Sequence, residues 1–497
     1  MLDQTSPAPD VEASAQETYA LVVIGAGIAG LNALYAATEY LPKGARVLLV
    51  DEKPDAGGMW NTAYDYVRLH QPHPMFTVGD MAWDWRKPRS YLAKRDEVQT
   101  HLGQALTPIA AQVGLQTAFG CVATACAEVS TAQGPMAEIR YHPLGAPDQE
   151  VTVRAARAIH AAGLNYGLAQ PLALRSAEVV SIIPQELAAT LAAHPGAPVH
   201  VVGGGKTGMD TVLATLAADP ARQITLYKGR GTNFLNRTRY LPMGIKRWTS
   251  GALVSRLFRD VALTYDGTQD DALIAHIRKT HSTDPETPNE VFLYGLQSEE
   301  EQARIQSGLS ATHADYLEDV VDGATGPEIR LRQGASLPVP PGSIFVNCGG
   351  SFFRDAEMPP VMPVLSPQGA ILSINTRHAF HFLTSVAGFF GAHLLYRDQL
   401  RGAGFYALDL EGLFRADRKA WVGASAAQAY HNQVLAVQTL PMMLLDRCGL
   451  DLDRWYPLPR RLLALAQMRA TAKADLAHCR KVLDLVTARY GIDAGPI

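Results

Sequence analysis

Residues 19–51 read YALVVIGAGIAGLNALYAATEYLPKGARVLLVD, and this stretch decides the fold. Its pattern predicts a strand, a glycine turn, a helix and a second strand, at residues 19–24, 25–30, 31–40 and 46–50. Three glycines, Gly25, Gly27 and Gly30, have the GxGxxG spacing that lets backbone approach a pyrophosphate at a helix N-terminus. Asp51 ends the second strand, 26 residues after Gly25, where an acid accepts hydrogen bonds from a ribose. The stretch therefore predicts a Rossmann-type dinucleotide site.

A second copy of this pattern lies at residues 199–227. An apolar strand leads into a turn that contains Gly203, Gly205, Lys206, Thr207 and Gly208, and a helix at 209–218 and a strand at 223–227 follow. The GKT tripeptide invites comparison with an ATPase phosphate loop. That motif needs a glycine five residues before Gly205, where the chain has His200. The second turn is therefore also predicted to bind a dinucleotide.

The charge after the second repeat predicts the coenzyme. Lys228 and Arg230 stand where an NAD-specific site would usually have an acid. Cations at this position can pair with the 2′-phosphate of NADPH, which a carboxylate would repel. The sequence favours NADPH, although both residues could equally be solvated turn charges. The same choice is open for Arg237 and Arg239, which could hold the phosphate or bind neighbouring carboxylates.

Apolar strands at 156–163 and 343–350 would close the two nucleotide-binding units. We therefore expect an α/β fold with two Rossmann-type domains, the first interrupted by the second, and additional C-terminal helices. The predicted parts are a loose tail at 1–18, a first domain at 19–164 plus 351–497, and a second domain at 165–350 with a helical insertion at 243–282 that could cap the substrate. Residues 328–339 predict a hairpin around Gly334, and residues 462–490 predict one or two helices that stop at Gly491.

The composition excludes several classes of function. The 497 residues carry 44 Lys and Arg against 48 Asp and Glu, a net charge of −4, so no nucleic-acid or anionic-membrane partner is expected. No apolar run is long enough to cross a membrane, and a soluble, cytoplasmic protein is expected. The five cysteines lack metal-type spacing, and no metal site is predicted. Cys121 and Cys126 are spaced CxxxxC but lie far beyond the first turn, so we interpret them as core residues and expect no disulfide reductase.

Four short stretches resemble the flavin-containing (class B, FAD- and NADPH-dependent) monooxygenase family. They are the Gly-Gly-x-Trp of Gly57, Gly58, Met59 and Trp60, the segments YDYVRLH at 64–70 and YLAKR at 91–95, and the Gly-Met-Asp at 208–210. The similarity covers residues 20–230 well and the rest hardly at all. It implies an FAD-binding first domain, an NADPH-binding second domain and an oxidoreductase activity. One feature of the family, Phe-x-Gly-x-x-x-His before the second glycine turn, has no counterpart in residues 172–198.

The resemblance implies that NADPH reduces FAD, that O₂ adds to the flavin at C4a, and that this peroxyflavin gives one oxygen to a small organic substrate, a soft nucleophile or a ketone. Because the family's histidine motif is missing, a second reading stays open, in which electrons pass to an organic acceptor without a stable peroxyflavin. A third is a non-catalytic nucleotide-binding protein. The oligomeric state is also open, with a homodimer as one option.

Candidate residues near the flavin follow from the same segments: Trp60, Asn61, His70 and Gln71. Asn61 or Gln71 could donate an amide hydrogen bond to the flavin, Trp60 could wall the pocket, and His70 could act as an acid or base because imidazole titrates near neutrality. Backbone donors facing the flavin would come from a helix start at 384–391 or from residues 423–428. The sequence does not distinguish the two stretches.

Overall fold

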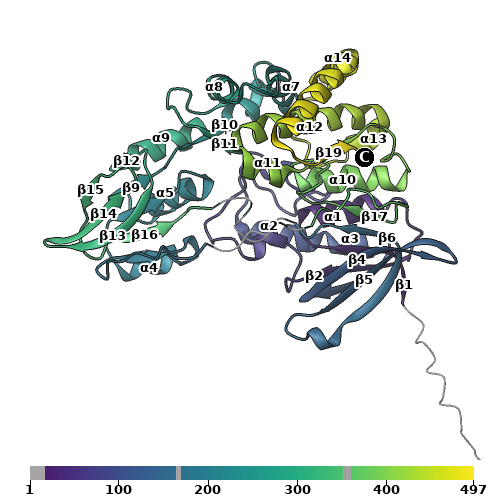
Figure 1. The fold of residues 1–497 in the computed structure, drawn as a ribbon, viewed down its shortest axis with the longest axis horizontal. Helices are drawn as coiled ribbons and strands as arrows, with labels where there is room; N and C mark the ends of the chain where they lie inside the picture. Colours follow the sequence, from purple (N-terminus) through teal and green to yellow (C-terminus); the bar gives the residue numbers. More distant parts are fainter. Residues whose placement is uncertain (1–16, 164–168, 351–352, 354–357, 359) are drawn as a thin grey trace, which may run out of the picture.

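The computed structural model describes residues 17–163, 169–350, 353, 358 and 360–497. Two units built on sheets lie side by side, and a group of helices covers the junction and the larger sheet (Figure 1). The predicted tail, residues 1–18, lies outside the described residues except for its last two positions, and Thr18 already belongs to the first strand. No helix among the described residues has the length and apolarity to cross a membrane.

The first sheet is parallel at its centre and carries an antiparallel extension. Its described strands are β1 (Thr18–Ile24), β2 (Arg46–Asp51), β3 (Gly114–Phe119), β4 (Cys121–Thr131), β5 (Gly134–Pro143), β6 (Val151–His160) and β17 (Ile371–Ser373), in the order β3-β2-β1-β6-β5-β4 with β17 on β6. Strand β6 is long enough to pair with β5 through its first half and with β17 through its last residues. The chain thus returns to this sheet after the second domain, as the sequence predicted.

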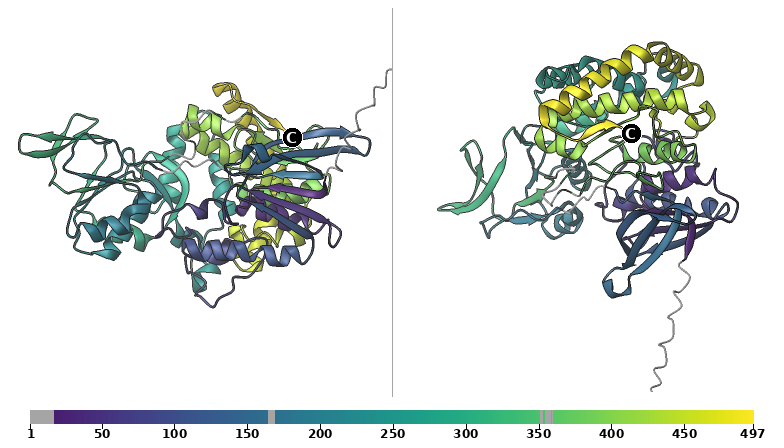
Figure 2. Two further views of the ribbon diagram at one scale, coloured as in Figure 1. Left: turned by 90° about the horizontal axis from the view of Figure 1, so that it is seen from below. Right: turned by 45° about the vertical axis from the view of Figure 1, so that its right-hand side comes forward.

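The second sheet is wholly parallel among the described residues, in the order β12-β9-β8-β16-β7. Its strands are β7 (Val180–Ile182), β8 (Val199–Val202), β9 (Ile224–Tyr227), β12 (Ala311–His313) and β16 (Ile344–Asn347), and its helices are α4 (Leu187–Ala193), α5 (Lys206–Ala218) and α9 (Glu299–Gly308). The predicted hairpin is present as β14 (Gly326–Leu331) and β15 (Ser336–Pro338), joined to β13 (Leu317–Gly323), and Gly334 has φ +92°. In both views of Figure 2 this unit projects away from the rest of the molecule.

The remaining elements belong to the junction and the helical group. They are α1 (Ile28–Ala37), α2 (Arg95–Gln104), α3 (Leu106–Ala110), β10 (Thr232–Asn236), α6 (Arg237–Tyr240), α7 (Val254–Thr264), α8 (Asp270–His281), β11 (Val291–Gln297), α10 (Thr384–Tyr396), β18 (Tyr406–Leu408), α11 (Leu410–Ala416), α12 (Arg418–Thr439), α13 (Met442–Leu445), α14 (Leu458–Tyr490) and β19 (Ala494–Pro496). The predicted C-terminal helices form one helix, α14, which ends at Gly491 with φ +61°.

Both predicted helices after the glycine turns start three residues earlier than expected. Helix α1 begins at Ile28 and α5 begins at Lys206, so the last glycine of each motif lies in the first turn of its helix. There a Cβ would meet backbone: at Gly30 it would lie 1.8 Å from the carbonyl oxygen of Gly25, and at Gly208 it would lie 2.0 Å from that of Gly203. The glycines therefore permit close packing of each helix on its turn, and they do not mark the end of the loop.

The predicted insertion, residues 243–282, packs against the C-terminal helices. Helix α7 starts where the carboxylate of Asp453 accepts hydrogen bonds from the backbone N–H groups of Val254, at 2.7 Å, and Ser255, at 3.3 Å. Its Arg259 forms a bidentate ion pair with Asp475 of α14, with N···O distances of 2.8 and 3.1 Å. An amphipathic pattern shows that one face of a helix is buried, but it does not show which element packs on that face. The sequence therefore grouped these helices with the second domain, in which they lie along the chain. The domain boundaries themselves stay a prediction.

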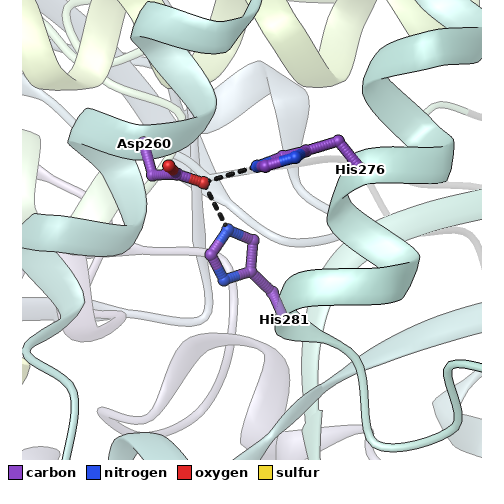
Figure 3. A group of neighbouring side chains, drawn as sticks. All are labelled: Asp260, His276 and His281. Carbon is purple, nitrogen blue, oxygen red and sulfur yellow. Dashed lines mark hydrogen bonds and ion pairs between the residues drawn. The ribbon is translucent and has the colours of Figure 1, made fainter.

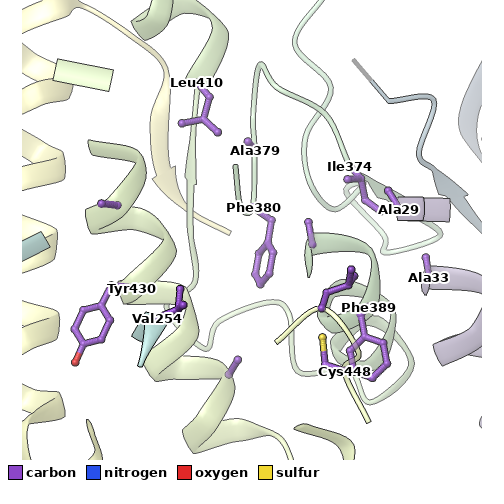
Figure 4. Packing of buried hydrophobic residues seen from close by; sticks show 14 of the residues in the cluster. Ala29, Ala33, Val254, Ile374, Ala379, Phe380, Phe389, Leu410, Tyr430 and Cys448 are labelled. Carbon is purple, nitrogen blue, oxygen red and sulfur yellow. The ribbon is translucent and has the colours of Figure 1, made fainter. Parts of the chain in front are cut away.

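Helix α10 packs on α1 at very short range (Figure 4). A Cβ at Gly388 would lie 2.3 Å from the carbonyl oxygen of Ala29, so only glycine allows this approach. Phe389, beside it on α10, is fully buried in the same cluster. This contact ties residues 384–396 to the helix that follows the first glycine turn, so one of the two C-terminal stretches is a helix start beside that turn. Residues 423–428 lie instead inside α12. Which stretch would face a flavin stays a prediction.

We predict that Gly388→Ala destabilises the protein, by about 1–3 kcal/mol, because the new methyl group must push α10 from α1. The matched control is Gly103→Ala in α2, where a Cβ has no heavy atom within 4 Å. That change should leave stability unchanged or raise it by a few tenths of a kcal/mol, about the gain in helix propensity. Thermal unfolding followed by circular dichroism compares the two. Equal midpoints would show that the close approach of α10 to α1 is not required.

Candidate functional site

The first glycine turn leaves an open position at the start of α1. Gly25 has φ +103°, and a Cβ there would lie 2.2 Å from the carbonyl oxygen of Ala161, so it serves the protein's own packing. Gly27 differs, because it is the N-cap of α1 and the nearest atom to its Cβ position is the Cα of Gly58, at 3.5 Å. The exposed N–H groups of a helix start attract anionic phosphates. A pyrophosphate therefore fits at Gly27.

Asp51 stabilises the first glycine turn through hydrogen bonds in addition to lying beside it. Its carboxylate accepts hydrogen bonds from the backbone N–H groups of Ala26, at 2.5 Å, and Lys53, at 2.7 Å. Burial raises the pKa of Asp51, and the two backbone hydrogen bonds oppose that rise. Each carboxylate oxygen keeps a further lone pair, so the group can still accept from a ribose. The predicted ribose ligand is thus positioned at the turn, although its predicted binding role stays a prediction.

The Gly57-Gly58 pair covers the first turn from the other side. Both have positive φ, +138° and +56°, and the Gly57 N–H donates to the carbonyl oxygen of Ala26 at 3.0 Å. A Cβ at Gly58 would lie 2.8 Å from the Cα of Gly27. The pair therefore lies directly over the phosphate position, where a larger residue would force the turn apart. Met59, which follows, is 56 % exposed.

Trp60 and Asn61 serve the packing of this segment. The Trp60 ring is buried and meets Phe76 edge to face, with ring centroids 5.8 Å apart. Asn61 accepts a hydrogen bond from the amide of Gln99 at 2.8 Å and donates to the carbonyl oxygen of Asp55 at 3.0 Å. Their predicted roles beside a flavin stay predictions, and Trp60 lies one layer behind the cavity described below.

The second turn has the same construction and a wider open position. Gly203 has φ +125°, and its Cβ would lie 2.7 Å from the carbonyl oxygen of Cys348. At Gly205, the N-cap of α5, a Cβ would have no heavy atom within 4 Å. Lys206, in the first turn of the helix, forms an ion pair with Asp210 of the next turn, and Thr207 lies between them in sequence. A phosphate group fits the space at Gly205.

Only one of the two predicted phosphate cations lies against this turn. A Cβ at Gly204 would lie 2.9 Å from the Cβ of Lys228, and the Lys228 ammonium donates to the Asn289 side chain at 2.9 Å. Burial lowers the pKa of Lys228. Arg230 is exposed at the surface. The structure thus brings Lys228 to the second turn, and the choice between phosphate ligand and turn charge stays open.

The further cations Arg237 and Arg239 bind groups of the protein. Arg237 pairs with Glu301 at 2.7 Å and donates to the backbone carbonyl of His70 at 3.1 Å. Arg239 donates to the backbone carbonyl of Thr280. Arg237 therefore binds a carboxylate and Arg239 a backbone carbonyl, and the predicted phosphate contact of either residue stays a prediction.

Residues 64–71 connect the two nucleotide-binding units. The hydroxyl of Tyr64 donates to Asp210 at 2.9 Å, and that of Tyr66 is 2.8 Å from the hydroxyl of Thr211, both on α5. His70 follows at the junction, where burial, with Lys206 and Arg237 acting in the same direction, lowers its pKa to about 3. The imidazole is therefore neutral at physiological pH. This shift removes the near-neutral titration on which the predicted acid/base role of His70 rests.

A largely apolar cavity of about 440 Å³ opens at this junction. Its wall includes His70 and Gln71 from the connecting segment and Leu383, Thr384 and Ser385 at the start of α10. The roof and sides come from distant segments: Val254, Leu257 and Phe258 of α7, Leu293 and Tyr294 of β11, and Trp421, Asn432 and Met468 of α12 and α14. Two predicted residues, His70 and Gln71, thus line one cavity with the predicted helix start at 384–391 and with α7 of the predicted insertion. Residues such as Tyr294, His381 and Asn432, which the sequence did not single out, complete the wall.

Two of the unexpected wall residues have unusual environments. Tyr294 has φ +58°, which is rare outside glycine, and its hydroxyl donates to the carbonyl oxygen of Val422 at 2.8 Å. His381 accepts a hydrogen bond from the backbone N–H of Leu383 at 3.0 Å, and burial lowers its pKa to about 3. No sequence signal marked either residue, because each gains its significance from contacts with segments far away in the chain.

Cys121 and Cys126 lie on β4, within the antiparallel extension of the first sheet. Burial raises the pKa of the Cys126 thiol to about 12, which makes it a poor nucleophile at neutral pH. Both pack on the cluster of buried side chains along that sheet. This agrees with their interpretation as core residues.

Comparison with known proteins identifies the first turn and the fold. Residues 23–80 match the family of NAD(P)-binding Rossmann-like domains. An uncharacterized protein of Mycobacterium tuberculosis is 24 % identical over 366 residues, which is 66 % of this chain and 59 % of that relative. The match therefore spans less than two thirds of the relative's length.

Solved structures share the arrangement of the elements. A cyclohexanone monooxygenase mutant from Rhodococcus sp. Phi1, bound to NADP⁺, superposes with a TM-score of 0.50 at 15 % identity, over 77 % of this chain and 85 % of that one. Ornithine hydroxylase from Pseudomonas aeruginosa (TM-score 0.49, 14 % identity, 77 % and 98 % coverage) and bacillithiol disulfide reductase from Bacillus cereus (0.45, 11 %, 77 % and 99 %) are also similar. The chain thus has an α/β fold with two Rossmann-type dinucleotide-binding domains.

The open position at Gly205 leads to a prediction about the second turn. Gly205 has φ −83°, which valine adopts freely, so the Gly205→Val variant should fold normally. Its side chain should fill the phosphate space and abolish NADPH binding, which calorimetry measures. Gly208→Val is the matched control, since its side chain would meet the Gly203 carbonyl and lower the unfolding temperature. Unchanged NADPH affinity in a folded Gly205→Val protein would remove the coenzyme from this turn.

Proposed function

We propose that this protein is an FAD-dependent, NADPH-using monooxygenase that inserts one oxygen atom into a small, apolar organic substrate. The observation that carries the proposal is the apolar cavity of about 440 Å³ at the junction, which residues of both nucleotide-binding units border or support. An oxygenating site has to exclude water, because water diverts reactive oxygen species from the substrate. A cavity walled by Leu, Phe, Val, Tyr and Trp side chains suits that task.

The two turns fit the two nucleotides. Gly205 provides open space at the N-terminus of its helix, Gly27 has only the Cα of Gly58 within 4 Å of its Cβ position, and Asp51 stands at the expected ribose position of the first turn. Bound FAD would supply two-electron chemistry with nicotinamide and with O₂, and the protein determines the acceptor. The pair Gly57-Gly58 supports assigning the flavin to the first turn, since the family resemblance implies a glycine pair beside the flavin.

The chain's own residues would orient the reactants. The start of α10 presents the backbone N–H groups of Thr384 and Ser385 at the cavity wall, where they can donate to an electron-rich ring edge. Gln71 lines the same cavity with an amide that can donate or accept. His70, held neutral beside Lys206 and Arg237, can accept a hydrogen bond without adding a charge.

The predominance of apolar side chains also limits the substrate. An uncharged ketone or thioether would bury well against Phe258, Leu293 and Met468. A charged group would lose hydration there, and it would find a counter-charge only beside Asp451, Asp453 and Arg461, which also border the cavity. One observation supports a second candidate, electron transfer to an organic acceptor: the family's histidine motif is missing between residues 172 and 198.

The experiment that separates these candidates follows the fate of O₂. With FAD-loaded protein, NADPH, ¹⁸O₂ and either cyclohexanone or methyl phenyl sulfide as probe, mass spectrometry should find one ¹⁸O atom in the product. Rapid mixing of the NADPH-reduced protein with O₂ should show flavin reoxidation in two phases. Single-phase reoxidation with hydrogen peroxide as the oxygen product and unlabelled probes would contradict the proposal and favour electron transfer.

A separate prediction concerns the coenzyme. Replacing Lys228 and Arg230 by alanine should raise the KM for NADPH about tenfold to a hundredfold, the value of one charge-assisted contact to the 2′-phosphate, and barely change that for NADH. Arg330→Ala, a cation on β14 in the same domain that pairs with Glu328, is the control. Equal losses with both coenzymes would show that the two cations do not recognise the phosphate.

A further inference from the structure

A group of three metal-type side chains lies apart from the cavity and both glycine turns. Asp260 belongs to α7, and His276 and His281 belong to α8 (Figure 3). The Nε2 atoms of the two histidines are 2.6 and 2.8 Å from the same oxygen of Asp260. The three potential ligand atoms all lie within 4.8 Å of one another. The sequence predicted no metal site, because these residues have no motif spacing and meet only when α7 packs beside α8.

We propose that these three residues bind a divalent zinc ion, through Nε2 of His276, Nε2 of His281 and the carboxylate of Asp260. Two imidazoles and one carboxylate form a donor set that suits zinc and are a poor match for magnesium or calcium, which prefer oxygen ligands. Zinc takes four ligands, and a water molecule would complete the tetrahedron.

The burial of the three residues leaves room for that water. The His281 side chain is 4 % exposed, that of His276 31 % and that of Asp260 42 %, so one ligand comes from the interior and two lie at the surface. Asp260 also borders an open hollow of about 390 Å³. Two cations, Arg256 and Arg259, border the same hollow, and the charge of Arg259 is offset by its ion pair with Asp475.

A second residue supports the metal-binding form of His281. Its Nδ1 is 2.5 Å from the hydroxyl of Tyr240, which is buried and lines the cavity. Without a metal, the Nε2–H of His281 donates to Asp260 and Nδ1 accepts from Tyr240. With zinc on Nε2, the proton resides on Nδ1 and donates to the Tyr240 oxygen, so His281 keeps Tyr240 as its partner and the Tyr240 hydroxyl hydrogen turns away toward the cavity that this residue lines. A hydrogen bond to the distal nitrogen is the usual way in which proteins orient a metal-binding histidine.

A bound zinc ion would fix the position of α7 relative to α8. Helix α7 supplies Val254, Leu257 and Phe258 to the cavity, and zinc on Asp260 would fasten α7 to α8. The ion would therefore hold the cavity roof in place, without contacting the substrate. This inference is independent of the reaction proposed above, because it depends on no bound nucleotide.

Calorimetry with untagged full-length protein, first treated with chelator, tests the proposal with ZnCl₂ as the ligand. We expect one zinc ion per chain with a Kd on the order of 1 μM or tighter, a higher unfolding temperature, and visible d–d bands of tetrahedral geometry when Co²⁺ replaces zinc. His276→Gln and Asp260→Asn, both at partly exposed positions, should each weaken binding at least about a hundredfold, and Tyr240→Phe about tenfold to a hundredfold.

His142→Gln, on β5 in the first sheet, is the matched histidine control and should bind zinc like the unmodified protein. Absence of stoichiometric binding to the unmodified protein would overturn the proposal. So would zinc affinity that survives in both folded variants, His276→Gln and Asp260→Asn, since the ion would then lie elsewhere. In that case the three side chains form a hydrogen-bonded link between α7 and α8.

Discussion

The approach of α10 to α1 is the constraint on which the rest of the structure depends. The Ala29 carbonyl occupies the place where any residue other than glycine at 388 would put its Cβ, so the C-terminal part of the chain can sit directly on the helix of the first glycine turn. That contact brings Thr384 and Ser385 to the wall of the cavity. Helices α12 and α14 follow α10 in the chain. Helix α7 is attached to this part of the molecule through Asp453, in the turn before α14, and through Asp475 of α14. One close packing contact thus assembles the cavity from both ends of the chain.

The glycine motifs have two kinds of position, which a sequence pattern does not separate. Gly25, Gly30, Gly203 and Gly208 are required because a Cβ would overlap the protein's own backbone. A Cβ at Gly27 would make only an ordinary contact with Gly58, at 3.5 Å, and one at Gly205 would meet no heavy atom within 4 Å. Asp51 likewise combines two tasks, since it fixes the turn through Ala26 and stands at the ribose position. Stability and binding are therefore linked in these turns. A substitution at Gly25, Gly30, Gly203 or Gly208 would lower the stability of the fold, so a loss of ligand binding in such a variant would not by itself locate the ligand.

The local sequence pattern was sufficient to predict the two nucleotide-binding units. The order of strand, turn, helix and acid at 19–51, its repeat at 199–227 and the capping Gly491 all follow from short-range sequence, and the structure confirms them. The cavity and the zinc cluster could not be predicted in this way. Tyr294, His381 and Asp260 acquire their roles only from partners far away along the chain, and the amphipathic pattern of 243–282 fixed a buried face without its partner. Likewise, nothing local distinguished residues 384–391 from 423–428.

We propose that the two nucleotide turns, at Gly27 in the first domain and at Gly205 in the second, serve a single apolar cavity. A crystal structure of the protein with FAD and NADP⁺ tests it most directly. We expect one pyrophosphate at the N-terminus of α1 near Gly27 and the other at the N-terminus of α5 near Gly205, with the flavin ring reaching the cavity between His70 and the start of α10. A flavin bound away from that cavity, or a nicotinamide nucleotide that does not touch the turn at Gly205, would contradict it.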